Sequence, residues 1–261
     1  KIAGVYITAN YPLKEELNII FFTFISFGLL GLYDDIKKFF GFQRQPFFGL
    51  RLRHKFLIQC LLAISVASML YFNLKIDFIN FPGVGKIFLG WFYLPLASFI
   101  IVSFTNAFNI TDGLDGLSGG LLLICLIAFG VLSATALDTP LAVFLALWLG
   151  GLIAFLYFNV YPARIWLGDV GALSFGATLA VVGLLLGKII ALLIIGAPFA
   201  IEAGSSLLQI LSKKFLKRKL FPASPLHLWL QLKGWEEPKI VMRAWLAGII
   251  FAIFGLWLAS F

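Results

Sequence analysis

The sequence predicts an all-α fold, a polytopic bundle of transmembrane helices, and two observations carry this prediction. Of the 261 residues, 61% are hydrophobic and only 12% are charged, whereas a soluble domain carries about 25% charged residues. The chain also contains eight apolar runs of roughly 20 residues, the length that an α-helix needs to cross a bilayer. Because a backbone in lipid must satisfy its own hydrogen bonds, such runs form helices rather than open strands.

The stretches between these runs contain proline, glycine and charge, which mark the ends of the spans. Between the second and third runs, residues 73–88 alternate apolar and polar side chains around a Pro-Gly pair, and this pattern predicts a short surface hairpin. We expect residues 1–261 to form a single integral-membrane domain. The expected spans are 17–33, 56–73, 88–108, 117–137, 141–159, 171–187, 189–210 and 240–261.

The charged residues predict the orientation of the bundle. Consecutive spans alternate in direction, so the connections 34–55, 106–116, 160–170 and 211–239 lie on one face. All but five of the 20 Lys and Arg residues lie in or next to these connections, and cytoplasmic loops are enriched in such cations. We therefore expect this face to be cytoplasmic. The net charge of +8 then reflects orientation and contact with anionic membrane lipids, with no nucleic acid as partner.

Seven of the 12 acidic residues fall on the same face, and the first two of these seven, Asp34 and Asp35, are adjacent. Adjacent carboxylates repel each other unless a cation or a proton lies between them, so one could bind a metal while the other acts as a base. The alternative is a solvated helix end at which Lys37 and Lys38 compensate the two charges.

The segment NAFNITDGLDGLSGG, residues 106–120, is the most informative stretch of the chain. Asp112 and Asp115 lie three residues apart, so on a helical turn both carboxylates would share one face, with Asn109 one turn before Asp112. The glycines allow a backbone to approach a ligand closely. A calcium loop is disfavoured because the later glutamate of the EF-hand is missing. A glycine-rich turn that caps a helix is the structural alternative.

Two more polar residues belong to this face. Asp169, at the start of the sixth run, is suited to bind Mg²⁺, which typically takes one or two carboxylates together with substrate phosphates; a helix N-cap is the alternative. His227 lies in the last cytoplasmic connection. Histidine suits proton transfer or phosphate contact near neutral pH, and the alternative is a structural histidine.

The chain resembles the polyprenyl-phosphate N-acetylhexosamine-1-phosphate transferase superfamily from about residue 28 to its C-terminus. The DG-x-DGL and GD-x-G motifs are typical of that superfamily, and the GW-x-E-x-K-x-V-x-R stretch favours its phospho-N-acetylmuramoyl-pentapeptide-transferase branch. The segments that carry the resemblance are LYDDIKK (32–38), GLRLRHKFLIQ (49–59), NAFNITDGLDGLSGG (106–120), FNVYPARIWLGDVGALSFG (158–176), IEAGSSLLQI (201–210) and PLHLWLQLKGWEEPKIVMRAW (225–245).

The resemblance implies that UDP-MurNAc-pentapeptide donates phospho-MurNAc-pentapeptide to undecaprenyl phosphate, with Mg²⁺ as cofactor and with lipid I and UMP as products. It implies catalytic roles for Asp34, Asp35, Asp112, Asp169 and His227, with the metal on Asp112 and Asp169. The substrate-binding residues that it implies are Lys38, Lys55, Asn109, Asp115, Asn159 and Trp166.

The resemblance also implies a wider setting. Trp166 occupies the aromatic position associated with uracil stacking. The family has ten spans, so two further spans are expected before the eight found here. The resemblance places the protein in a bacterial inner membrane and implies that it forms a homodimer. Its pattern has three consecutive histidines, of which this chain keeps His227 alone. GlcNAc-1-phosphate or another UDP-sugar therefore remains an alternative donor group, and a non-catalytic lipid-phosphate-binding homologue is a further alternative. We expect direct attack by the lipid phosphate rather than an intermediate bound to Asp34 or Asp35.

Overall fold

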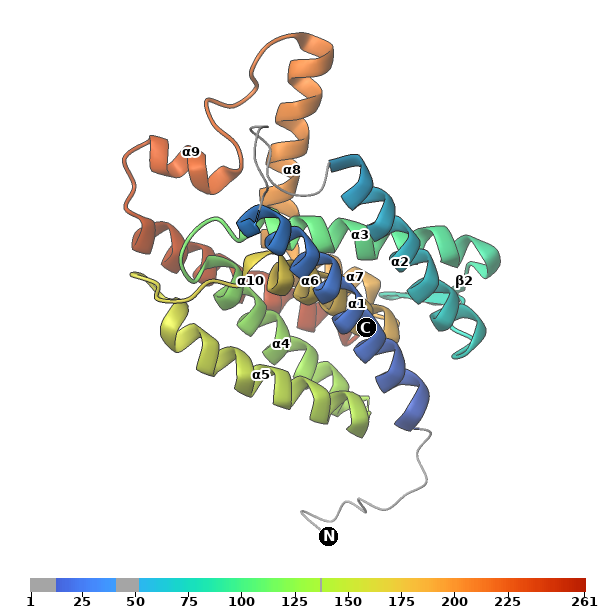
Figure 1. The fold of residues 1–261 in the computed structure, drawn as a ribbon. Coiled ribbons are helices and arrows are strands. Elements are labelled where there is room, and N and C mark those ends of the chain that lie inside the picture. The colour runs from blue at the N-terminus through green and yellow to red at the C-terminus, as the bar shows by residue number, and fades with distance from the viewer. Residues whose placement is uncertain (1–12, 41–51, 137) are drawn as a thin grey trace.

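The computed structural model describes residues 13–40, 52–136 and 138–261. Seven helices in these ranges are long and apolar enough to cross a membrane, and α7 and α8 together form an eighth, bent candidate. The prediction of an all-α transmembrane bundle is thus confirmed (Figure 1). The helices are α1 (Leu13–Phe40), α2 (Leu52–Phe72), η1 (Gly90–Phe92), α3 (Tyr93–Thr111), α4 (Leu117–Thr135), α5 (Thr139–Asn159), α6 (Gly168–Leu185), α7 (Ile189–Ile195), α8 (Ala197–Leu211), η2 (Ser212–Leu216), α9 (Leu226–Leu232) and α10 (Glu237–Ala259).

Helix α6 is the most buried of the seven span candidates in the described ranges, with 78% of its apolar window inside the protein. It packs against α1 on one side and against α3 on another. Glycines allow both contacts, as small residues do in membrane bundles. A Cβ atom added at Gly176 would lie 2.6 Å from the carbonyl oxygen of Phe104 on α3, and one added at Gly31 of α1 would overlap the carbonyl group of Asp169 on α6. These three helices are therefore held close enough to share polar side chains.

Most expected boundaries differ from the structure by a few residues, and two of these differences change how the fold is understood. Helix α1 continues to Phe40, so Asp34 and Asp35 lie more than one turn before its end rather than at it. The third span begins at Gly90, where η1 leads directly into α3, rather than at residue 88, because residues 85–88 pair as a strand. Residues 41–51 of the connection 34–55, which was expected on the cytoplasmic face, lie outside the described residues.

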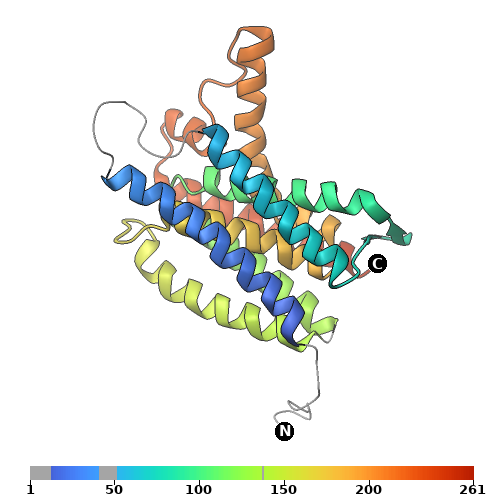
Figure 2. The ribbon, with the colours of Figure 1, turned by 45° about the vertical axis from the view of Figure 1, so that its right-hand side comes forward.

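The seventh expected span, 189–210, is not one straight helix. It breaks at Gly196 into α7 and α8, whose axes differ by 74°. Pro198, in the first turn of α8, has no backbone N–H to continue the hydrogen bonds of α7. Helix α8 consequently projects out of the bundle, as Figures 1 and 2 both show.

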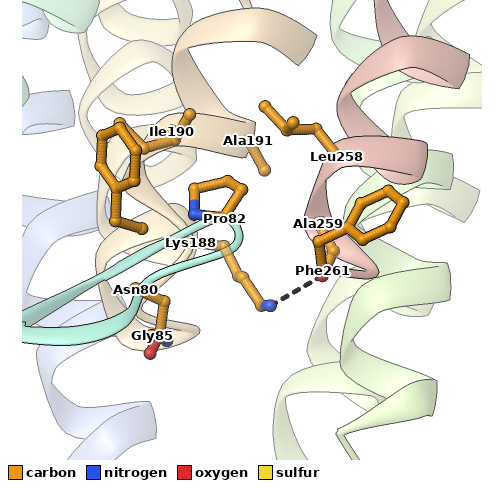
Figure 3. A pocket seen from close by; sticks show the side chains of 10 residues that line it. Asn80, Pro82, Gly85, Lys188, Ile190, Ala191, Leu258, Ala259 and Phe261 are labelled. Atoms are coloured by element: carbon orange, nitrogen blue, oxygen red, sulfur yellow. Dashed lines mark hydrogen bonds between the residues drawn. The ribbon is translucent and has the colours of Figure 1, made fainter.

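The predicted hairpin is present and lies at the end of the bundle where α2 finishes. Strands β1 (Phe78–Phe81) and β2 (Gly85–Phe88) pair antiparallel. The backbone N–H of Asn80 donates to the carbonyl oxygen of Gly187, 3.1 Å away, which joins the hairpin to the turn between α6 and α7. Beside it, Lys188 lines a cavity of about 150 Å³ and its Nζ donates to the carbonyl oxygen of Ala259 at 2.8 Å (Figure 3). This lysine satisfies a carbonyl group at the C-terminal end of α10, where a cation is favourable.

Candidate active site

Charged side chains from three helices meet at the opposite end of the bundle, where α1 ends and α2 begins. Lys55 Nζ on α2 lies 3.0 Å from Asp34 Oδ2 on α1 and 2.6 Å from Asp169 Oδ2 on α6. Lys38 Nζ, one turn after Asp34, lies 3.2 Å from Asp34 Oδ2 and donates to the same oxygen of Asp169. Asn109 Nδ2 on α3 donates to Asp169 Oδ1 at 2.8 Å. Asp34 is only 3% exposed, and a buried carboxylate is costly unless cations and hydrogen bonds compensate its charge.

The two adjacent aspartates have different environments. Asp34 contacts both Lys38 and Lys55. Asp35 Oδ1 lies 3.5 Å from Lys38 Nζ, and its Oδ2 accepts a hydrogen bond of 3.1 Å from the backbone N–H of Val170. Val170 is in the first turn of α6, where backbone N–H groups have no partner within the helix. Asp35 therefore caps α6 from a neighbouring helix, and this contact places the start of α6 against α1.

Asp169 itself is not the cap of its helix. It follows Gly168, the first residue of α6, and the residue at the N-cap is Leu167, whose side chain makes no capping hydrogen bond. The carboxylate of Asp169 instead faces Lys38 and Lys55. The N-cap alternative for Asp169 is therefore wrong.

Asp112 and Asp115 do not share a helical face, contrary to expectation. Helix α3 ends at Thr111, and residues 112–116 form a turn that ends with Gly116 at φ +76°, a conformation that favours glycine. Asp112 Oδ1 accepts a hydrogen bond from Ser118 Oγ on α4. Burial raises the pKa of the Asp112 carboxyl above its usual value, the hydrogen bond from Ser118 opposes this, and the negative charge of Asp169 raises it further.

Asp115 points away from Asp112 and binds the connection between α5 and α6. Its Oδ2 accepts from the backbone N–H of Ala163 at 2.9 Å, and its Oδ1 accepts from Trp166 Nε1 at 3.2 Å. Asn159, buried at the end of α5, donates from Nδ2 to the carbonyl oxygen of Ile165 at 2.9 Å. Both residues thus hold the loop that presents Trp166, whose side chain is 70% exposed.

His227 lies against the turn of residues 112–116 and is only 2% exposed. Its Nδ1 lies 3.0 Å from Glu202 Oε2 on α8. A Cβ atom added at Gly113 would lie 2.6 Å from His227 Nε2, so the ring edge is in close contact with the turn that connects Asp112 and Asp115. The structure thus brings His227 next to the predicted aspartate motif, as the sequence alone could not show.

Three residues that sequence reasoning did not select hold this turn or its neighbour His227 through hydrogen bonds. Glu237 Oε1, at the start of α10, accepts the backbone N–H of Asp115 at 2.6 Å, and Trp245 Nε1 donates to the carbonyl oxygen of Gly116 at 3.1 Å. The third is Glu202, the partner of His227. A signal for Glu202 was present, because a carboxylate inside an apolar span needs a partner.

The carboxylates can be tested against the requirements of Mg²⁺. In the part of the chain that the structure describes, no group of three His, Cys, Asp or Glu residues could hold a metal by itself. Mg²⁺ does not need one, because it usually takes one or two carboxylates and completes its shell with water and phosphate oxygens. Asp112 and Asp169 meet that requirement in number and in ligand type. Burial and the negative charge of Asp169 both raise the pKa of Asp112, so a cation beside Asp112 would be favourable, whereas the charge of Asp169 is already compensated by Lys38 and Lys55.

Comparison with known proteins identifies the family of the chain. Residues 17–187 match the model of glycosyl transferase family 4. The phospho-N-acetylmuramoyl-pentapeptide-transferase of Thermodesulfovibrio yellowstonii is 39% identical in an alignment that covers 91% of this chain and 71% of that protein. Two proteins of the same name are similar as well. The one from Borrelia turicatae is 38% identical over 91% of this chain and 72% of its own length. The one from Bacillus subtilis is 35% identical over 94% of this chain and 75% of its own length.

The range that matches the family model includes Asp34, Lys38, Lys55 and Asp169, which together form the lysine–aspartate cluster of the site. The relatives extend the similarity over most of the remaining chain. On both grounds, the chain belongs to glycosyl transferase family 4 and, within it, to the family of phospho-N-acetylmuramoyl-pentapeptide-transferases.

Proposed function

We propose that this chain transfers phospho-N-acetylmuramoyl-pentapeptide from UDP-MurNAc-pentapeptide to undecaprenyl phosphate, with lipid I and UMP as products. The observation that carries the proposal is the cluster of Asp34, Asp169, Lys38 and Lys55, in which both carboxylates are buried and Lys38 is accessible from outside; it lies wholly inside the range that matches the family model. The name of the relatives supplies the transferred group. The UDP-GlcNAc alternative has no comparable support.

The reaction exchanges one phosphoanhydride bond for another. An oxygen of the acceptor phosphate attacks the phosphorus atom that bears the sugar, and the bond from this phosphorus to the oxygen bridging to UMP breaks, so that UMP leaves with the electron pair. Both reactants are anions, so catalysis depends on positioning and on compensation of charge. Lys38 and Lys55 are two cations that the described part of the chain supplies at this point.

The four aspartates of the site have different proposed roles. Asp34 is buried and paired with both lysines, and Asp35 caps α6. These positions favour the role of holding the lysines and α6 in place over that of a nucleophile, which supports direct attack by the lipid phosphate. Asp112 and Asp169 are the residues that we propose hold Mg²⁺. When bound, this ion acts as a Lewis acid on the phosphate oxygens.

Trp166 is the proposed contact for the uracil ring. Its indole is exposed, and Asp115 fixes it through the hydrogen bond to Nε1. We propose further that the site faces the cytoplasm from a bacterial inner membrane. The asymmetric distribution of Lys and Arg supports this orientation, because the site and most of these cations lie at the same end of the spans.

The decisive experiment is an assay of UMP release by the purified protein with UDP-MurNAc-pentapeptide, undecaprenyl phosphate and Mg²⁺. We expect wild-type protein to release UMP and to form lipid I, and Asp169→Asn to abolish both. Lys86→Met, in the hairpin at the opposite end, is the matched control and should keep full activity. Binding of the nucleotide without turnover would favour a non-catalytic homologue, and faster release from UDP-GlcNAc would favour the alternative donor.

A further inference from the structure

Glu202 is a carboxylate where the sequence is otherwise apolar. It belongs to the first turns of α8 and is only 7% exposed. Removing a carboxylate from water is costly unless hydrogen bonds or a cation compensate the charge. The residue that provides this compensation indicates what Glu202 does.

That residue is His227. Glu202 Oε2 lies 3.0 Å from His227 Nδ1 and 3.3 Å from the backbone nitrogen of the same residue, which donates to it. One carboxylate oxygen thus holds both the main chain and the ring of His227. His227 is the second residue of α9, so this contact also joins α9 to α8, which lie side by side in Figure 1.

The other nitrogen of the ring faces the aspartate turn. A Cβ atom at Gly113 would lie 2.6 Å from His227 Nε2 and 3.1 Å from Cε1, so no other residue type fits there without displacing the ring. Gly113 directly follows Asp112, and the turn continues to Asp115. The two ring nitrogens therefore have distinct neighbours, a carboxylate at Nδ1 and the aspartate turn at Nε2.

We propose that Glu202 is a positioning residue for His227, which it holds in the tautomer with the proton on Nδ1. A carboxylate can only accept, so Nδ1 must donate, and in the neutral ring this leaves the lone pair of Nε2 directed at the turn from Asp112 to Gly116. This inference rests on the proposed function for its catalytic consequence. Under that function, Nε2 is the atom of His227 that meets the phosphates of the donor, and Glu202 acts only through it.

The tautomer can be measured without any substrate. The chain contains two histidines, His54 and His227, so protein labelled with ¹⁵N-histidine gives two sets of ring signals, which a His54→Gln variant assigns. For His227 in the wild type we expect a protonated Nδ1 and a proton-free Nε2. Glu202→Gln should keep this pattern, because the amide oxygen can still accept from Nδ1, whereas Glu202→Leu should shift the proton to Nε2.

Activity then separates positioning from a purely structural role. We expect Glu202→Leu to lower kcat by at least about tenfold with little change in KM, and Glu202→Gln to retain most of the wild-type kcat. Leu207→Ala, an exposed position on the same helix, is the control and should change neither constant.

Two results would overturn the inference: a wild-type His227 protonated on Nε2 alone, or a Glu202→Leu protein with unchanged ring signals. If Glu202→Leu does not fold, the wild-type and Glu202→Gln spectra still show which ring nitrogen of His227 carries the proton, and so test the inference. Because the spectra need no turnover, an inactive wild type would count against the proposed function and leave the positioning role to be judged by the ring signals.

Discussion

Lys55 on α2 and Asp169 on α6 form an ion pair of 2.6 Å although 114 positions separate them in the chain. The same ammonium group lies 3.0 Å from Asp34 on α1. One cation therefore connects three helices, and its charge compensates two carboxylates that would otherwise repel each other. The arrangement of the site depends on this lysine as much as on the aspartates.

Replacement of Lys55 tests this dependence. We expect Lys55→Met to lower kcat by about 100-fold, as loss of a preorganised donor does. It should lower the free energy of unfolding by about 1–3 kcal/mol, less than the loss of the sole partner of a buried charge, because Lys38 remains. UMP release and the denaturation midpoint in detergent are the measurements. Lys55→Arg keeps the charge, and unchanged activity of Lys55→Met would contradict the assigned role.

Asp35 is predicted to act through the start of α6. Asp35→Asn retains an oxygen that can accept from the N–H of Val170 and loses the partly exposed ion pair of 3.5 Å with Lys38, which contributes little, so its thermal stability should be close to that of the wild type. Asp35→Ala removes the acceptor and should lower the free energy of unfolding by about 1 kcal/mol, as loss of an N-cap does. Comparison of the two midpoints checks this. Equal destabilisation by both variants would show that charge rather than capping matters.

The close approach of α1 and α6 at Gly31 gives a third prediction. A methyl group there would overlap the backbone of Asp169, so Gly31→Ala should destabilise the protein by about 1–3 kcal/mol and displace Asp169, with loss of activity. Gly28→Ala, one turn earlier, meets Ser174 Cβ at an ordinary 3.7 Å and should be neutral or stabilising by up to about 1 kcal/mol. Equal tolerance of the two alanines, in melting temperature and in UMP release, would refute the close packing.

Trp166 should affect affinity rather than stability. Stacking of a base on an aromatic ring contributes about 1–3 kcal/mol, so Trp166→Ala should raise the KM for the UDP-sugar by about 5- to 150-fold, with little change in melting temperature because the side chain is 70% exposed. Trp166→Phe retains a ring and should stay close to the wild type. Trp91→Ala, an exposed tryptophan near the hairpin, is the control and should leave KM unchanged. A KM unaffected by Trp166→Ala would place the uracil elsewhere.

Much of the site was predictable because its residues occur in recognisable motifs, yet their contacts were not. Spacing suggested that Asp112 and Asp115 act together, but the end of α3 at Thr111 turns them apart, one toward Ser118 and one toward Ala163. Likewise, Asp34 and Asp35 are equivalent in sequence and differ in the structure. Side chains three residues apart share a face only while the helix continues, and the backbone dihedrals of a few residues decide where it ends.

The sequence by itself determined the class of fold, the number and order of the apolar spans, the hairpin, and the gathering of charge at one end. These follow from composition and periodicity, because lipid imposes the same requirements on each span separately. Only the tertiary structure decided the 74° bend between α7 and α8, the capping of α6 by Asp35 and the pairing of Glu202 with His227. Such contacts depend on distances of a few ångströms between helices far apart in the chain. Helix packing sets those distances, and local sequence does not encode them.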